Sequence, residues 1–203
     1  MRQCGKYDLS VAVVVKYRER VMAREKVYTR AGDDGTTGLF YGGRVGKDSA
    51  LPRAYGAVDE AQSILGLVRA EAGKGTELDD MLVNICRDLW VLMAELATLP
   101  ENRHKLVDGK TRVTTEMVTH LETMIDSLDE RFTPPTDFVV PGQNKVSALL
   151  DVGRTVTRRA ERHSLAAAPP PSQSTPYLNR LSDLLWTLAR WQEGESLAVK
   201  DVI

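Results

Sequence analysis

Apolar side chains recur at spacings of three and four residues in five stretches of the chain, a pattern typical of amphipathic helices. Prolines and glycines close these stretches, and Thr76 is placed to cap the second one. The predicted helices cover residues 54–72, 76–100, 115–129, 144–167 and a segment that begins at Thr175. Because strand-like alternation is nearly absent, the pattern predicts an all-α fold, an antiparallel five-helix bundle.

The fourth predicted helix carries arginines beside its apolar stripe. Successive side chains turn by about 100° in a helix. The residues expected on the core side are Val146, Leu149, Gly153, Val156 and Ala160. The residues expected along the border are Arg154, Arg158 and Glu161, with Arg162 slightly further round. A solvated basic flank is the ordinary interpretation, but guanidinium groups in successive turns also suit a polyphosphate, because each can bind phosphate oxygens in bidentate fashion.

The segment 27–48, VYTRAGDDGTTGLFYGGRVGKD, interrupts the helical pattern with glycines and threonines. Glycine lets backbone N–H groups approach an anion, and threonine hydroxyls and Lys47 add donors, so this N-terminal Gly/Thr-rich segment is a candidate nucleotide-binding loop. Its end resembles a Walker A loop, but only three residues separate Gly42 from Gly46, and Asp48 replaces the hydroxyl residue that would hold magnesium. An ordinary P-loop kinase is therefore a minor alternative.

Charge and cysteine content limit the possible function classes. The 203 residues include 27 Lys and Arg against 28 Asp and Glu, so no overall charge draws the chain to nucleic acid or to an anionic membrane. The apolar run at 11–15 is too short for a signal-peptide core or a membrane span. Cys4 and Cys86 form no disulfide framework, and we expect a cytoplasmic protein.

The length suits one core. We expect one domain over residues 27–193, a C-terminal tail over 194–203 and an N-terminal extension over 1–26. Met22 lies just before the loop and could serve as the start site, so the extension would be either disordered or wrongly assigned. A first strand or helix docked on the domain is the alternative.

Side chains that usually carry out catalysis or bind metals form no cluster in the sequence. His104, His120 and His163 lack the Glu-x-x-His spacing of a di-metal bundle site. We find no zinc-ligand cluster, nucleophile elbow or Cys–His pairing either. We therefore predict no protein metal site and no side-chain nucleophile.

Four motifs follow one another along residues 27–191. They read YTRAGDDGTTGLF, AYGAVDEAQSILG, FVVPGQNKVSALLDVGRTVTRRAER and YLNRLSDLLWTLAR. Together they resemble the PduO-type ATP:cob(I)alamin adenosyltransferases. The resemblance implies a homotrimer that binds ATP, Mg²⁺ and cobalamin at subunit interfaces, and that transfers the 5′-deoxyadenosyl group of ATP to cob(I)alamin, giving adenosylcobalamin and triphosphate. It also implies a corrinoid reductase and an adenosylcobalamin-dependent enzyme as partners.

The resemblance assigns roles to individual residues. The ATP-contacting positions of the family are matched by Thr29, Arg30, Ala31, Gly32, Thr37, Gly38, Lys47, Arg158, Arg159, Glu161, Arg162 and Asn179. Arg154 and Asp59 match a pair that forms an intersubunit salt bridge. Phe138 matches the phenylalanine that displaces the lower ligand of cobalt. The expected catalytic residues are Phe138, Arg154, Arg158 and Asp59.

The chain also departs from the family pattern. Asp151 and Gly153 stand where the family usually has histidine and alanine, and Pro52 lies in the approach to the first helix. These changes could indicate a different corrinoid preference or a paralogue without activity. The alternative function is therefore an ATP- or adenosylcobalamin-binding protein that delivers or senses the cofactor without significant turnover. Because the phosphate-binding positions are intact, we expect an active enzyme.

Overall fold

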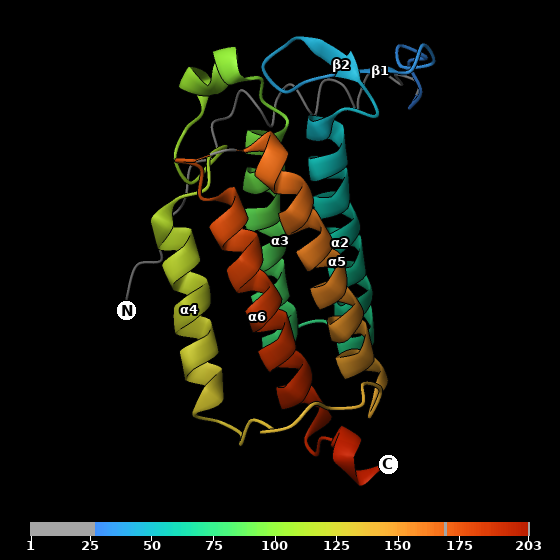
Figure 1. Ribbon diagram of the computed structural model, residues 1–203, viewed down its shortest axis with the longest axis vertical. Coiled ribbons are helices and arrows are strands. Elements are labelled where there is room, and N and C mark those ends of the chain that lie inside the picture. The colour runs from blue at the N-terminus through green and yellow to red at the C-terminus, as the bar shows by residue number, and fades with distance from the viewer. Residues whose placement is uncertain (1–26, 169, 203) are drawn as a thin grey trace. The chain divides into compact units, whose positions relative to one another are not determined.

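Long helices dominate the described part of the chain, which comprises residues 27–168 and 170–202 of a computed structural model. They are α2 (Ala50–Ala72), α3 (Glu77–Leu96), α4 (Thr115–Asp129), α5 (Lys145–Ala167) and α6 (Ser174–Glu193). Successive helices run in opposite directions along the bundle (Figure 1). The predicted all-α bundle of five helices is therefore confirmed for the described residues.

The chain divides into two units, Met1–Thr36 and Thr37–Ile203, and the second unit contains all five of these helices. Short elements complete the described structure. A two-stranded sheet is formed by β1 (Thr36–Gly38) and β2 (Arg44–Gly46), and the 3-10 helices are η1 (Pro100–Lys105) and η2 (Val199–Asp201). The helical pattern did not predict these short elements. The expected N-terminal extension, 1–26, lies outside the described residues.

Side-chain caps fix where two helices begin. Thr76 accepts a hydrogen bond from the backbone N–H of Asp79 at 3.2 Å, as the sequence predicted for the start of α3. Asn144 and Ser147 form a reciprocal capping box at the start of α5. Asn144 also donates from Nδ2 to the carbonyl oxygen of Gln192 at 2.8 Å. The first turn of α5 is therefore tied to the last turn of α6.

The core lies where α5 packs between α2 and α6, with α3 against α2 and α4 against α6. Helices α2 and α5 lie close together at Gly153, where an added Cβ would be in ordinary van der Waals contact with Leu65 at 3.4 Å and with Ile64 at 3.6 Å. All of the predicted core leucines of α3 and α6 are buried, namely Leu78, Leu82, Leu89, Leu92, Leu96, Leu181, Leu184, Leu185 and Leu188. The hydrophobic stripes therefore determine which face of each helix packs inward.

The buried stripe of α5 differs from the prediction in its position. Val146 and Leu149 are only partly buried, whereas Leu150 and Thr157 are buried fully. The stripe is thus rotated toward Leu150. It includes Asp151 and Ser164, whose side chains have partners on α6, and Thr157, whose buried hydroxyl has no hydrogen-bond partner among the described residues. This rotation brings Asp151, which the apolar pattern would leave at the border, to the α6 side.

The connection between α4 and α5 crosses the lower end of the bundle in Figure 1. Pro134 and Pro135 follow α4 and keep this segment extended. The segment carries Phe138 and leads directly into the start of α5. It is the element that brings Phe138 to the helices.

Candidate functional site

Two arginines on α5 point away from the core. Arg158 and Arg162 are exposed, and within the described part of the chain neither guanidinium has an ion-pair or hydrogen-bond partner. We call these two residues the arginine face. A surface arginine usually finds a carboxylate when one is near, so two unpaired guanidinium groups one turn apart form a local excess of positive charge. The arginine face can bind an anion without first breaking a protein contact.

Neighbouring polar residues on α5 have partners on other helices. Glu161 accepts a hydrogen bond from Nδ2 of Asn179 on α6, with a distance of 3.1 Å to Oε1. Arg159 forms an ion pair with Glu60 of α2. The structure therefore brings the predicted residues Glu161 and Asn179 together, and it places Arg159 on the side of α5 that faces α2.

The described end of the first unit is a tight turn. Arg30 adopts a positive φ of 59°, and the backbone N–H of Ala31 lies 3.3 Å from Oγ1 of Thr29. Gly32 accepts a hydrogen bond from the N–H of Gly35 at 3.2 Å. These four residues, all predicted to contact ATP, form one local turn with exposed or partly buried side chains.

The second half of the predicted loop belongs to the helical unit. Thr37 and Gly38 lie in β1, and Lys47 follows β2 with its side chain exposed. The turn between the strands is attached to the bundle, because the N–H of Phe40 donates to the carbonyl oxygen of Ala97 at 3.0 Å. This attachment anchors the strands that carry the predicted phosphate-binding residues.

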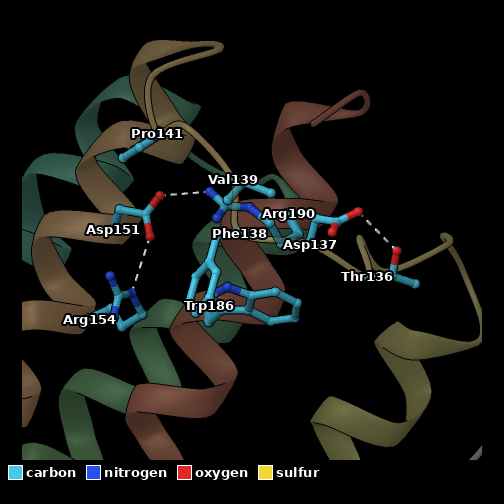
Figure 2. Close-up of a pocket in the computed structure, with 9 residues that line it drawn as sticks. All are labelled: Thr136, Asp137, Phe138, Val139, Pro141, Asp151, Arg154, Trp186 and Arg190. Atoms are coloured by element: carbon cyan, nitrogen blue, oxygen red, sulfur yellow. Dashed lines mark hydrogen bonds and ion pairs between the residues drawn. The ribbon is translucent and has the colours of Figure 1, made fainter. Parts of the chain in front are cut away.

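A pocket of about 540 Å³ opens at the end of the bundle where α5 begins and α6 ends. Its lining residues, shown in Figure 2, are Thr136, Asp137, Phe138, Val139, Pro141, Asp151, Arg154, Trp186 and Arg190. Phe138 and Arg154, both predicted as catalytic residues, thus line the same pocket. Phe138 is 89% exposed, so its side chain is not part of the hydrophobic core.

Three of these lining residues belong to a cluster of two acids and two arginines, which we call the acid–arginine cluster: Asp151, Arg154, Arg190 and Glu193. Oδ2 of Asp151 accepts a hydrogen bond from Nη2 of Arg190 at 2.6 Å, and Oδ1 lies 3.2 Å from Nε of Arg154. Nε of Arg190 lies 2.8 Å from Oε1 of Glu193. The side chains of Arg190 and Glu193 are 2% and 0% exposed, so their charges depend on each other for compensation.

Asp59 and Arg154 do not meet within this chain. Asp59 is exposed on α2, and no ion pair of its carboxylate occurs among the residues that the structure describes. Arg154 is instead paired with Asp151 on its own helix. The predicted Asp59–Arg154 bridge between subunits stays a prediction.

Buried titratable groups also occur away from the pocket. Burial raises the pKa of the Asp88 carboxyl, although Arg87 and the hydroxyl of Tyr177 partly offset this effect. Tyr177 Oη lies 3.2 Å from Oδ2 of Asp88 and is itself buried, which raises the pKa of the phenol.

Over the described ranges, no group of three or more His, Cys, Asp or Glu side chains is placed to hold a metal ion. No described helix is long and apolar enough to cross a membrane.

Comparisons with known proteins bear on this site. The family profile described as cobalamin adenosyltransferase matches residues 27–192. A corrinoid adenosyltransferase of Citrobacter freundii is 41% identical over 171 residues, which cover 83% of this chain and 95% of that protein. A corrinoid adenosyltransferase of Mycobacterium tuberculosis is 41% identical, over 81% of this chain and 87% of that protein. Among solved structures, a variant PduO-type ATP:corrinoid adenosyltransferase of Lactobacillus reuteri, complexed with cobalamin and ATP, superposes with a TM-score of 0.76 at 28% identity, covering 87% and 97% of the two chains.

Proposed function

The chain belongs to the cobalamin adenosyltransferase family, and we propose that it transfers the 5′-deoxyadenosyl group of ATP to the cobalt of cob(I)alamin, releasing triphosphate. The observation that carries the proposal, beyond family membership, is the arginine face. Arg158 and Arg162 present two guanidinium groups that have no protein partner among the described residues, and such groups can stabilise a departing triphosphate.

The binding of ATP is the first part of the proposal. We assign the triphosphate to Arg158, Arg162 and Lys47, together with the backbone N–H groups of the glycine- and threonine-rich segment. The further residues assigned to ATP are Thr29, Arg30, Ala31, Gly32, Thr37, Gly38, Arg159, Glu161 and Asn179. Mg²⁺ would enter on the phosphate oxygens of ATP, because the described residues offer no protein cluster of three or more ligands. When bound, the ion would neutralise charge on the leaving group.

The chemistry needs no nucleophile from the protein, because cob(I) itself attacks the 5′ carbon of ATP. The bond from this carbon to the triphosphate oxygen breaks as the Co–C bond forms, and the electron pair of the broken bond leaves with triphosphate. The protein must therefore bring the two substrates together and stabilise the charge that develops on the leaving oxygen.

The pocket around Phe138 suits one edge of a corrinoid. It offers an exposed aromatic ring, a second aromatic in Trp186, and polar groups on Asp137 and Arg154 that can bind amide side chains. We propose that the Phe138 ring lies on the lower axial side of cobalt. An apolar ring there would keep the lower ligand away and so favour the reduction of cob(II)alamin. The geometry of Phe138 supports this role, since its ring is exposed into the pocket (Figure 2).

Assembly and location are further parts of the proposal. A homotrimer would place Asp59 of one subunit against Arg154 of the next, which explains why Asp59 is exposed and unpaired among the described residues of the single chain. We expect a cytoplasmic enzyme that receives electrons from a corrinoid reductase and passes adenosylcobalamin to an enzyme that depends on it.

The test is product formation by the full-length protein. Purified protein with ATP, Mg²⁺ and chemically reduced cob(I)alamin should form a light-sensitive Co–C bond and one triphosphate per adenosylcobalamin. Absence of the product under strong reduction would refute the transfer reaction. Tight adenosylcobalamin binding without synthesis would instead identify a delivery or sensing protein.

A further inference from the structure

Phe138 receives little support from the protein core. Its side chain is 89% exposed and lies in the connection between α4 and α5 rather than in a helix. Packing therefore does not fix the ring, and its position must follow from the backbone that carries it. The hydrogen bonds of this backbone therefore determine the position of the Phe138 ring.

That backbone is paired with the C-terminal end of the chain. The N–H of Val199 donates to the carbonyl oxygen of Phe138, and the N–H of Val140 donates to the carbonyl oxygen of Leu197, both at 2.8 Å. Val139 and Ala198 face each other between these two bonds in an antiparallel bridge. Residues 138–140 are thus paired through their backbone with residues 197–199, some 60 positions later in the sequence.

Side chains attach the C-terminal segment 196–201 at both of its ends. Lys200 forms an ion pair with Asp137, the residue before Phe138, and this contact lowers the pKa of the Asp137 carboxyl. At the other end, the hydroxyl of Ser196 donates to Oε1 of Glu193, whose carboxylate is paired with the buried Arg190. Residues 196–201 are therefore connected both to the Phe138 segment and to the acid–arginine cluster at the pocket.

We infer that residues 196–201, which we call the tail clamp, are a positioning element that holds Phe138 at the corrinoid site. The inference rests on the proposed function for the meaning of that site. It concerns residues that lie beyond the segment 27–192 matched by the family profile. The tail clamp does not contact the substrate. It acts through the backbone of residues 138–140, and loosening it should affect the step that needs Phe138 in place.

A proline substitution can remove one clamp hydrogen bond without removing the tail. Val199 is the first residue of η2, where proline is tolerated, and Ala198 before it has φ −73° and ψ 140°, which suit a residue that precedes proline. Val199→Pro deletes the N–H that donates to Phe138. Ala198→Pro is the matched control, because the φ of Ala198 already fits proline and its N–H donates no hydrogen bond within the described residues.

The first readout follows Phe138 without any reaction. The chain contains three phenylalanines, Phe40, Phe132 and Phe138, so fluorine-labelled phenylalanine gives few NMR signals, and Phe138→Leu identifies one of them. Val199→Pro should shift or broaden the Phe138 signal and leave the other two unchanged, whereas Ala198→Pro should leave all three unchanged. An unchanged Phe138 signal in Val199→Pro would overturn the inference, whatever the enzyme assay shows.

The second readout separates positioning of Phe138 from the transfer reaction. With cob(II)alamin and a reductant, Val199→Pro should slow product formation by about tenfold, as expected for a displaced positioning group. With cob(I)alamin supplied ready-made, its rate should stay within about twofold of wild type, because the transfer step itself is intact. Equal rates of Val199→Pro and wild type with cob(II)alamin would overturn the inference. If wild type made no product even from cob(I)alamin, the proposed function would fail, while the NMR comparison would still decide whether the tail clamp holds Phe138.

The ion pair offers an independent comparison between two exposed lysines. The side chains of Lys200 and Asp137 are 65% and 40% exposed, and those of Lys145 and Glu71, a second pair, are 71% and 38% exposed. Lys200→Met should move the Phe138 NMR signal, and Lys145→Met should leave it in place. The exchanged pair Asp137→Lys with Lys200→Asp should restore the wild-type signal. If Lys200→Met and Lys145→Met move the Phe138 signal equally, the Asp137–Lys200 ion pair does not contribute to the position of Phe138.

Discussion

The arginines of α5 and α6 form two regions that differ in whether a carboxylate of the protein is paired with the guanidinium group. The arginine face, Arg158 and Arg162, is exposed and has no partner among the described residues, whereas Arg154 and Arg190 of the acid–arginine cluster are paired with Asp151. The two regions use the same guanidinium chemistry, but among the described residues the cluster has carboxylates against its arginines and the arginine face has none. The difference shows that an arginine available to a ligand is recognised by its missing protein partner rather than by its residue type.

The same comparison explains the different burial of the two regions. Arg190 can be 2% exposed because two carboxylates lie within 3 Å of its nitrogens. Arg158 could not be buried in that way without a carboxylate of its own. We therefore expect substitutions in the cluster to change the stability of the fold, and substitutions on the arginine face to change the use of ATP.

The largest effect should follow from Arg190→Met, which removes the buried cation and leaves the acids. Glu193, with a side chain that is 0% exposed, would keep a negative charge without its partner. We expect a loss of about 3–5 kcal/mol in the free energy of unfolding. The melting temperature should fall by about 10 °C, since a chain of this size loses a few degrees per kcal/mol. Chemical and thermal unfolding measure both quantities.

A double variant shows whether the loss comes from charge or from packing. Glu193→Gln in the Arg190→Met background removes the stranded charge and should recover a large part of the loss. A loss below about 1 kcal/mol in Arg190→Met, as for an exposed pair, would contradict the role of the cluster.

A smaller effect, and one on activity instead of stability, is expected for Arg158→Ala. Loss of hydrogen bonds from one guanidinium to a charged group is worth about 2–3 kcal/mol, so kcat/KM for ATP should fall about a hundredfold. The melting temperature should stay close to that of wild type, because Arg158 is exposed and makes no protein contact among the described residues. Steady-state kinetics at varied ATP and a thermal melt are the two measurements.

Two further variants sharpen the assignment of Arg158. Arg158→Lys keeps the charge but loses the bidentate fork, and its kcat/KM should lie between wild type and Arg158→Ala. Lys74→Ala removes an exposed cation at the turn between α2 and α3 and should leave ATP kinetics unchanged. A normal kcat/KM in Arg158→Ala would separate the arginine face from ATP.

The helices could be predicted because their core is made of local patterns. Leucines at spacings of three and four identify the inner faces of α3 and α6, and a capping Thr76 marks where α3 starts. The place of Arg158 outside the apolar stripe of α5 could also be predicted, because it follows from the angle per residue. These features depend only on residues within a few turns of one another.

The features that sequence reasoning missed depend on distant contacts. Arg190 has the sequence position of a surface residue in the last turn of α6, but it is buried against two carboxylates, one of which belongs to Asp151, 39 positions earlier. The pairing of residues 138–140 with 197–199 uses backbone groups, which leave no mark in side-chain patterns. The sequence feature that could have indicated a buried arginine is the pair of acids at 151 and 193, each in a helical segment that contributes to the core. Buried acids need partners, and Arg190 is close to Glu193 in the sequence.

The smallest predicted effect concerns Asp88, a buried acid whose closest partner is not a buried arginine. Burial raises its pKa, and its partners are the hydroxyl of Tyr177, the exposed Arg87 at 3.7 Å and, more weakly, His120. A carboxyl with a raised pKa in the folded protein contributes full stability below its unfolded pKa, about 4, and loses that contribution as pH rises through the folded pKa. Asp88→Asn keeps an acceptor for Tyr177 but cannot ionise. The free energy of unfolding of Asp88→Asn should therefore rise relative to that of wild type as pH increases above about 4. Urea unfolding of both proteins between acidic and neutral pH measures this difference. A difference that does not change with pH would mean that Asp88, like Asp151, already has its charge compensated, and that burial alone does not separate the acids of this bundle from one another.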